Sequence, residues 1–107
     1  MPLTRDFKKT VLARVQRDPA FRKALLTEGV EAFLSGDVDT GKAVLRDCIN
    51  ATIGFSELAI AMKRSPKSLM RMLGPNGNPQ AQNLFDIIAF LLREEGVHLK
   101  VTLAKAS

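Results

Sequence analysis

The chain has 107 residues, 46% of them hydrophobic, and a formal net charge of +5. This length suits one compact domain, and the hydrophobic content is too high for a disordered chain. One cysteine, Cys48, and one histidine, His98, cannot form an internal disulfide or the four-ligand set of a structural zinc site. We therefore expect a single domain, residues 1–107, without a metal or another cofactor.

Residues 1–53 are predicted to form N-terminal helices. The first runs from Thr4 to about Gln16, because its apolar residues recur at helical spacing. Asp18-Pro19 ends it and starts a second helix, since proline is tolerated at the first helical position. Ser35-Gly36 ends the second helix, and a third, with an aspartate cap, closes at Gly54.

Residues 54–96 carry three more predicted helices. Two are short, about Ser56–Met62 and Pro66–Leu73, and each has a serine in the capping position. The turn-rich run Gly74–Pro79 separates them from a last helix that ends at Gly96. In the tail, residues 97–107, the alternation of apolar and polar residues over Val97–Leu103 predicts a short β-strand, which needs a partner strand.

The sequence contains no pattern typical of a membrane span, a signal peptide or a catalytic site. The longest apolar run, Ile87–Leu92, is far shorter than the roughly 20 residues of a membrane span. No signal-peptide segment follows the first cations, so we expect a cytoplasmic protein without a membrane partner. No catalytic set of side chains can be assembled around Cys48 or His98, and the GPNGN run lacks the lysine and serine of a phosphate-binding loop. The chain is not expected to be an enzyme.

Positive charge is concentrated in two segments. Between Leu58 and Phe85 there are four cations and no carboxylate, which favours a surface facing phosphates. A second group of cations near the N-terminus is either another electrostatic patch or a solvated helix face: Arg5, Lys8, Lys9, Arg14 and Arg17.

The two short helices are separated by only three or four residues, so they must cross steeply if both are to bury an apolar face. The small Ala59 permits a close approach of the second helix, whose outward face then carries its polar residues. We predict DNA base contacts from that face, by Lys67, Ser68 and Arg71. We predict phosphate contacts from the turn and the following loop, by Lys63, Arg64, Ser65, Asn76, Asn78 and Gln80.

Leu58-Ala59 followed by Ser65, Leu69 and Arg71 resembles the Cro/repressor-type (Xre-like) helix-turn-helix. That resemblance implies an all-α, five- to six-helix domain of lambda-repressor-like type. The motif's usual turn glycine is replaced by Lys63, which must adopt a left-handed backbone if the standard turn is kept. Its usual apolar neighbour is replaced by Arg64, which favours a slightly opened turn whose cations reach phosphate.

The longer stretch Ile49–Val101 is similar to the antidote proteins (antitoxins) of toxin–antitoxin addiction modules. The similarity is carried by Ala59, by the SLMRML run of Ser68–Leu73, and by the Gly77-Asn78-Pro79 turn. It implies a homodimer that represses its own operon by binding the operator, and a partner toxin that cleaves messenger RNA. The alternative is a protein-interaction module that neutralises a toxin with little DNA specificity, through the N-terminal helices or the tail strand.

Overall fold

The computed structural model describes residue 10, residues 13–14 and residues 16–106, and within these it contains five helices. They are α2 (Pro19–Leu34), α3 (Val38–Ala51), α4 (Gly54–Met62), α5 (Pro66–Met72) and α6 (Ala81–Glu94). The predicted helix Thr4–Gln16 lies largely outside the described residues, although those described between 10 and 17 are helical. The expected all-α class is confirmed.

Side-chain caps explain where several helices begin. Asp18 accepts a hydrogen bond from the Phe21 amide at 3.2 Å, and Pro19 follows as the first residue of α2. Asp37 caps α3 by accepting from the Thr40 amide. The prediction for Ser56 is wrong: α4 begins two residues earlier, at Gly54, without a side-chain cap. Gly54 has a φ of +81°, which glycine adopts readily and which lets α4 turn away directly after α3.

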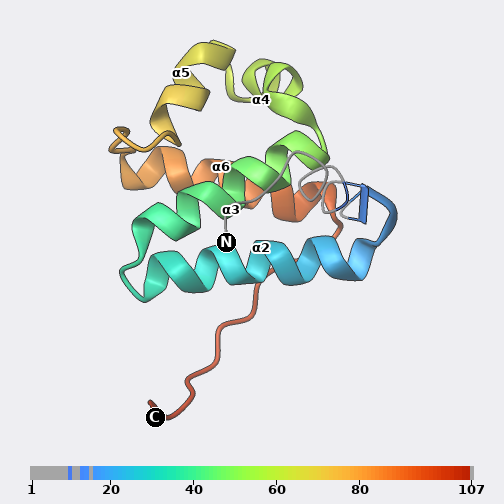
Figure 1. The fold of residues 1–107 in the computed structure, drawn as a ribbon, viewed down its shortest axis with the longest axis vertical. Coiled ribbons are helices and arrows are strands. Elements are labelled where there is room, and N and C mark those ends of the chain that lie inside the picture. The colour runs from blue at the N-terminus through green and yellow to red at the C-terminus, as the bar shows by residue number, and fades with distance from the viewer. Residues whose placement is uncertain (1–9, 11–12, 15, 107) are drawn as a thin grey trace.

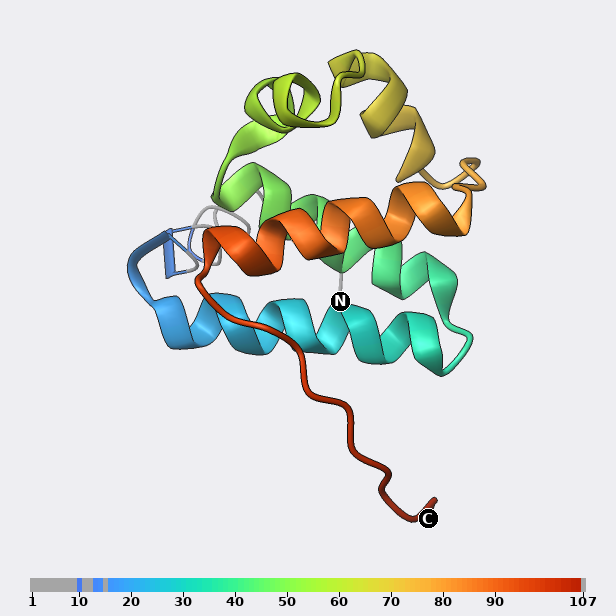
Figure 2. The same ribbon diagram turned by 180° about the vertical axis from the view of Figure 1, so that it is seen from behind.

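The helices are arranged in layers around one core (Figures 1 and 2). Helices α2 and α3 lie side by side, and α6 lies behind α3 in Figure 1 and in front of it in Figure 2, with its C-terminal end close to α2. Helices α4 and α5 form one end of the molecule. The six largest fully buried side chains come from α3, α4, α6 and the segment of α5: Leu45, Ile49, Leu58, Leu69, Leu73 and Ile87. Helix α2 adds Leu26 and Val30 to the same cluster.

The predicted C-terminal strand is absent: Val97–Leu103 has no regular secondary structure and no strand partner within the described chain. Leu99 packs against the core, whereas Val101 and Leu103 are exposed. Apolar and polar residues do alternate in this segment, but a strand needs a neighbouring strand for its backbone hydrogen bonds. The described chain contains no other strand. The tail leaves the molecule at the end opposite α5 (Figures 1 and 2).

Candidate nucleic-acid interface

The connection between α4 and α5 is a tight turn of three residues, Lys63 to Ser65. Lys63 has φ 57° and ψ 46°, the left-handed conformation expected of it from the sequence. The Arg64 amide then donates to the Ala59 carbonyl oxygen at 3.0 Å, which closes the end of α4. A non-glycine residue in this conformation costs about 1 kcal/mol, so the turn is held by its surroundings rather than by local preference.

Helix α5 is anchored by its apolar side. Leu69 and, directly after the helix, Leu73 have no exposed surface. At its start, Ser65 Oγ accepts from the Ser68 amide at 3.1 Å, as predicted for a capping serine, and Pro66 occupies the first helical position. With the apolar side fixed, the opposite side of α5 faces solvent.

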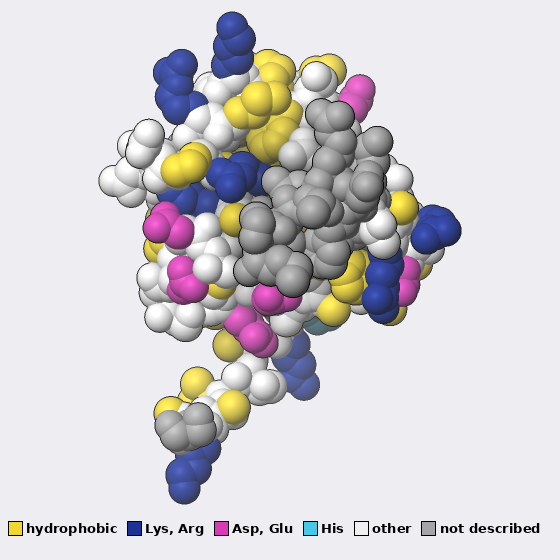
Figure 3. Space-filling model, viewed as in Figure 1, with side chains coloured by type: hydrophobic (Ala, Val, Ile, Leu, Met, Phe, Trp, Pro, Cys, Tyr) yellow, Lys and Arg dark blue, Asp and Glu magenta, His cyan; other side chains and the backbone are white. Residues whose placement is uncertain are grey.

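The residues predicted to contact bases lie on this solvent side. Lys67 and Arg71 are exposed and stand one helical turn apart, and Ser68 between them is half-buried. In the described part of the chain no ion pair involves Lys67 or Arg71. Figure 3 shows Lys and Arg side chains projecting from the end of the molecule that α4 and α5 form.

An open hollow of about 480 Å³ lies between α5, the loop after it and the start of α6. Its lining includes six of the nine predicted contact residues: Arg64, Ser68, Arg71, Asn76, Asn78 and Gln80. The other three, Lys63, Ser65 and Lys67, lie outside it. Among the described residues no carboxylate lines the hollow, so its two guanidinium groups give it a positive charge.

One polar residue of the lining was not predicted from the sequence. Asn83, in the first turn of α6, accepts a hydrogen bond from Arg64 Nη2 on its Oδ1 at 2.7 Å. This bond holds the Arg64 guanidinium beside Asn83 in the lining of the hollow. Asparagine at this point gave no signal in the sequence, because nothing local relates positions 64 and 83.

A second unpredicted feature is a pair of cations on α3 that bind carbonyl groups at the C-terminal end of α5. Lys42 on α3 has only 3% of its surface exposed, and its ammonium donates to the carbonyl oxygens of Gly74 at 2.9 Å and Gly77 at 2.8 Å. One turn along α3, Arg46 Nη1 donates to the Leu73 carbonyl oxygen at 2.8 Å. These two cations satisfy carbonyl groups at and just beyond the C-terminal end of α5, where cations are favoured.

Gly77 is required by the same arrangement. A Cβ atom there would overlap the carbonyl oxygens of Arg71 and Met72, because the loop folds back against the end of α5. The loop, the end of α5 and the two α3 cations therefore form one packed unit.

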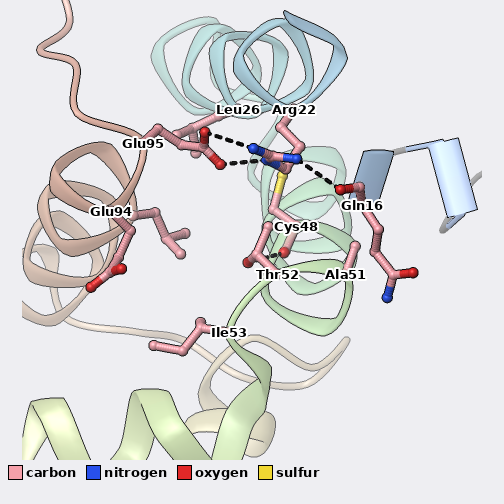
Figure 4. A pocket seen from close by; sticks show the side chains of 10 residues that line it. Gln16, Arg22, Leu26, Cys48, Ala51, Thr52, Ile53, Glu94 and Glu95 are labelled. Atoms are coloured by element: carbon pink, nitrogen blue, oxygen red, sulfur yellow. Dashed lines mark hydrogen bonds and ion pairs between the residues drawn. The ribbon is translucent and has the colours of Figure 1, made fainter. Parts of the chain in front are cut away.

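A separate pocket of about 360 Å³ lies on another side of the molecule, between α2, α3 and α6 (Figure 4). In it the Arg22 guanidinium forms a double hydrogen bond with the Glu95 carboxylate, at 2.6 and 3.3 Å, and the hydrogen bond to Glu95 raises the pKa of Arg22. Burial raises the pKa of the Cys48 thiol from 9.0 to about 12. A buried thiol whose pKa is raised in this way is a poor nucleophile.

The remaining candidates lie apart from α5. Arg14 forms a 4.0 Å ion pair with Asp18 and lies over the Phe21 ring, and Arg17 donates to the Ala13 carbonyl, so both have local structural contacts. Arg5, Lys8 and Lys9 lie outside the described residues. His98 is exposed on the tail. Within the described chain no group of three potential metal-binding side chains comes together.

No helix of the described chain is long and apolar enough to cross a membrane. Comparison with protein-family models, with curated proteins and with solved structures finds no match to this chain.

Proposed function

We propose that the protein is a sequence-specific regulator that binds double-stranded DNA through α5. The observation that carries the proposal is a short helix anchored by its buried apolar side, with Lys67, Ser68 and Arg71 on its open side. Beside it lies a hollow that no carboxylate of the described residues lines. Arginine forms paired hydrogen bonds with guanine in a major groove, whose width admits a helix. The hollow then faces the sugar–phosphate backbone, where Arg64 and the loop amides Asn76 and Asn78 hold a phosphate.

Arg71→Ala tests the assignment of base contacts. We expect it to weaken binding to the preferred sequence by about 1–3 kcal/mol and to relax discrimination at one base pair, because a paired contact is lost. Fluorescence anisotropy on the preferred sequence, and on variants with each base pair exchanged, measures both effects. An equal loss on preferred and shuffled DNA would mean that Arg71 contacts only the backbone.

Salt dependence tests the phosphate contacts. If four to six phosphates are neutralised per dimer, the logarithm of affinity is expected to fall with the logarithm of salt concentration at a slope of roughly −4 to −5. Lys63→Gln, at an exposed position of the turn, should reduce the size of that slope by about two, because each dimer loses two such lysines, while leaving sequence preference intact. A slope near zero would contradict binding through this positive surface.

The resemblance to antidote proteins extends the proposal to autorepression of the protein's own operon and to neutralisation of a toxin. The tail offers a surface for the second role: Val97–Leu103 has no regular secondary structure and no strand partner in the described chain, and it exposes Val101 and Leu103. Such a segment can add a strand to the edge of a partner's sheet. Its position opposite α5 leaves DNA and a protein partner on different sides.

Deleting the residues after Gly96 separates the two roles. We expect the shortened protein to keep its DNA affinity and to lose neutralisation of the toxin encoded beside it. Anisotropy and a growth-rescue assay measure the two activities. A parallel loss of DNA affinity would instead indicate that the tail joins two copies of the chain.

A further inference from the structure

The outer side of helix α6 borders a hollow of about 260 Å³, whose other wall is formed by Ala61 and Met62 of α4. The inner side of α6 buries Ile87, Ile88 and Leu91 against the core. Figure 2 shows α6 in front of α3, so the opposite side of α6 faces outward in that view. That outer side carries Asp86 and Arg93, both exposed, with the small, half-buried Ala89 between them. Phe85 lies beside this stripe with 60% of its surface exposed.

The two charges on this face have a definite register. Asp86 and Arg93 are seven residues apart, which is nearly two full turns, so they lie on one side of α6 about 10 Å from each other. Within the described residues neither takes part in an ion pair, although Asp86 accepts a hydrogen bond from Gln82. An exposed acid and an exposed base on one stripe cannot reach each other in the same helix at that distance. In a second copy of α6 that runs antiparallel to the first, however, the basic residue lies opposite Asp86 and the acidic residue lies opposite Arg93.

We propose that α6 pairs antiparallel with α6 of a second copy of this chain, around a two-fold axis beside Ala89. In that arrangement each Asp86 faces Arg93 of the other copy, and each Arg93 faces Asp86, because the axis lies midway between these positions. The small side chain of Ala89 lets the two helices approach closely at their crossing. The other copy also covers part of the exposed Phe85 ring, which favours association through loss of apolar surface from water.

The same two-fold axis has a consequence for α5. When two antiparallel helices meet face to face, the axis lies in their contact plane and perpendicular to both. In Figure 2 α6 runs across the view, with α4 and α5 on one side of it, so a rotation about this axis keeps the α4 and α5 end on the same side in both copies. Two α5 helices therefore face the same side, as binding to successive major grooves of one DNA molecule requires. Only this last point rests on the proposed function.

Charge reversal tests the interface in the absence of DNA. Sedimentation equilibrium is expected to show a monomer–dimer equilibrium for the full chain. Asp86→Arg and Arg93→Asp should each weaken dimerisation about tenfold, because each creates two like-charge contacts per dimer. The double exchange, Asp86→Arg with Arg93→Asp, should restore dimerisation to within about threefold of the original, because opposite charges again face each other. Glu28→Arg, an exposed position on α2 with the same change in charge as Asp86→Arg, is the matched control and should have little effect.

The interface is wrong if the chain stays monomeric, if the single reversals change nothing, or if the double exchange stays as weak as the single reversals. An independent measurement uses Ala89→Cys, which should form a covalent dimer on mild oxidation, since its position lies beside the axis. The native Cys48 is 5% exposed and does not compete. Ala24→Cys, exposed on α2, is the control, and equally rapid cross-linking there would contradict the assignment. Because none of these measurements contains DNA, a failure of DNA binding leaves them intact, and the reverse also holds.

Discussion

Gly77→Ala is expected to abolish sequence-selective DNA binding and to lower the free energy of unfolding by about 3 kcal/mol. The added Cβ overlaps the carbonyl oxygens of Arg71 and Met72, so either the loop or the end of α5 must move. Any such movement also displaces the Gly77 carbonyl from the Lys42 ammonium. Urea unfolding gives the change in stability, and anisotropy on preferred and shuffled DNA gives the change in selectivity.

Gly96→Ala is the matched control for this change. Gly96 has a φ of +69°, so alanine costs backbone strain there, but no atom within 4 Å would meet the new Cβ. We expect this variant to lose about 1 kcal/mol of stability and to keep its DNA selectivity. If Gly77→Ala binds DNA as selectively as Gly96→Ala does, the loop does not position α5.

Lys42→Met is expected to destabilise the protein by about 2–4 kcal/mol and to reduce selective DNA binding about tenfold. Methionine fills a similar volume but cannot donate, so the carbonyl oxygens of Gly74 and Gly77 lose a partner inside the protein. Binding to shuffled DNA should change much less, because the cations of the α5 side remain in place.

Hydrogen exchange distinguishes local from general loosening in this variant. The amides of Leu73 and Gly74, which donate within the end of α5, should exchange about tenfold faster, while those in the middle of α2 should be unaffected. Lys23→Met, an exposed lysine on α2, removes the same charge without the same contacts and is the control. Uniformly faster exchange in Lys42→Met would assign Lys42 a role in stability alone.

Much of the helical framework could be predicted because its signals are local. Asp18-Pro19 and the Ser65-Pro66 pair mark helix starts through capping chemistry that needs only a few neighbouring residues. The left-handed backbone at Lys63 was expected from the resemblance to a helix-turn-helix whose usual turn glycine this residue replaces. The six predicted residues that line one hollow are likewise close in sequence, between positions 64 and 80.

Features that depend on distant residues could not be predicted. Lys42 lies in an acidic stretch of sequence, and lysine is a residue type usually found at the surface. Its ammonium nevertheless donates hydrogen bonds to carbonyl groups 32 and 35 positions away. Asn83 is paired with Arg64 only through the fold. The tail was predicted wrongly for a related reason. Its local alternation is typical of a strand, but the described chain contains no second strand with which it could pair.

The contacts around α5 bear on whether a helix of only seven residues could have the proposed role in recognition. A helix this short has little stability of its own in water. Here Leu69 fixes its apolar side, and Arg46 holds the carbonyl just beyond its C-terminal end. The side chains of its open face are therefore presented from a fixed backbone, which reduces the entropy lost on binding.

The central claim is that α5 reads a DNA sequence. It is tested most directly by fluorescence anisotropy of the purified protein on DNA from upstream of its own gene, against the same DNA shuffled, at two salt concentrations. We predict a preference for its own DNA of about a hundredfold or more that persists at the higher salt concentration. Equal binding to both DNAs that disappears at higher salt would contradict sequence recognition and leave α5 as part of a basic surface.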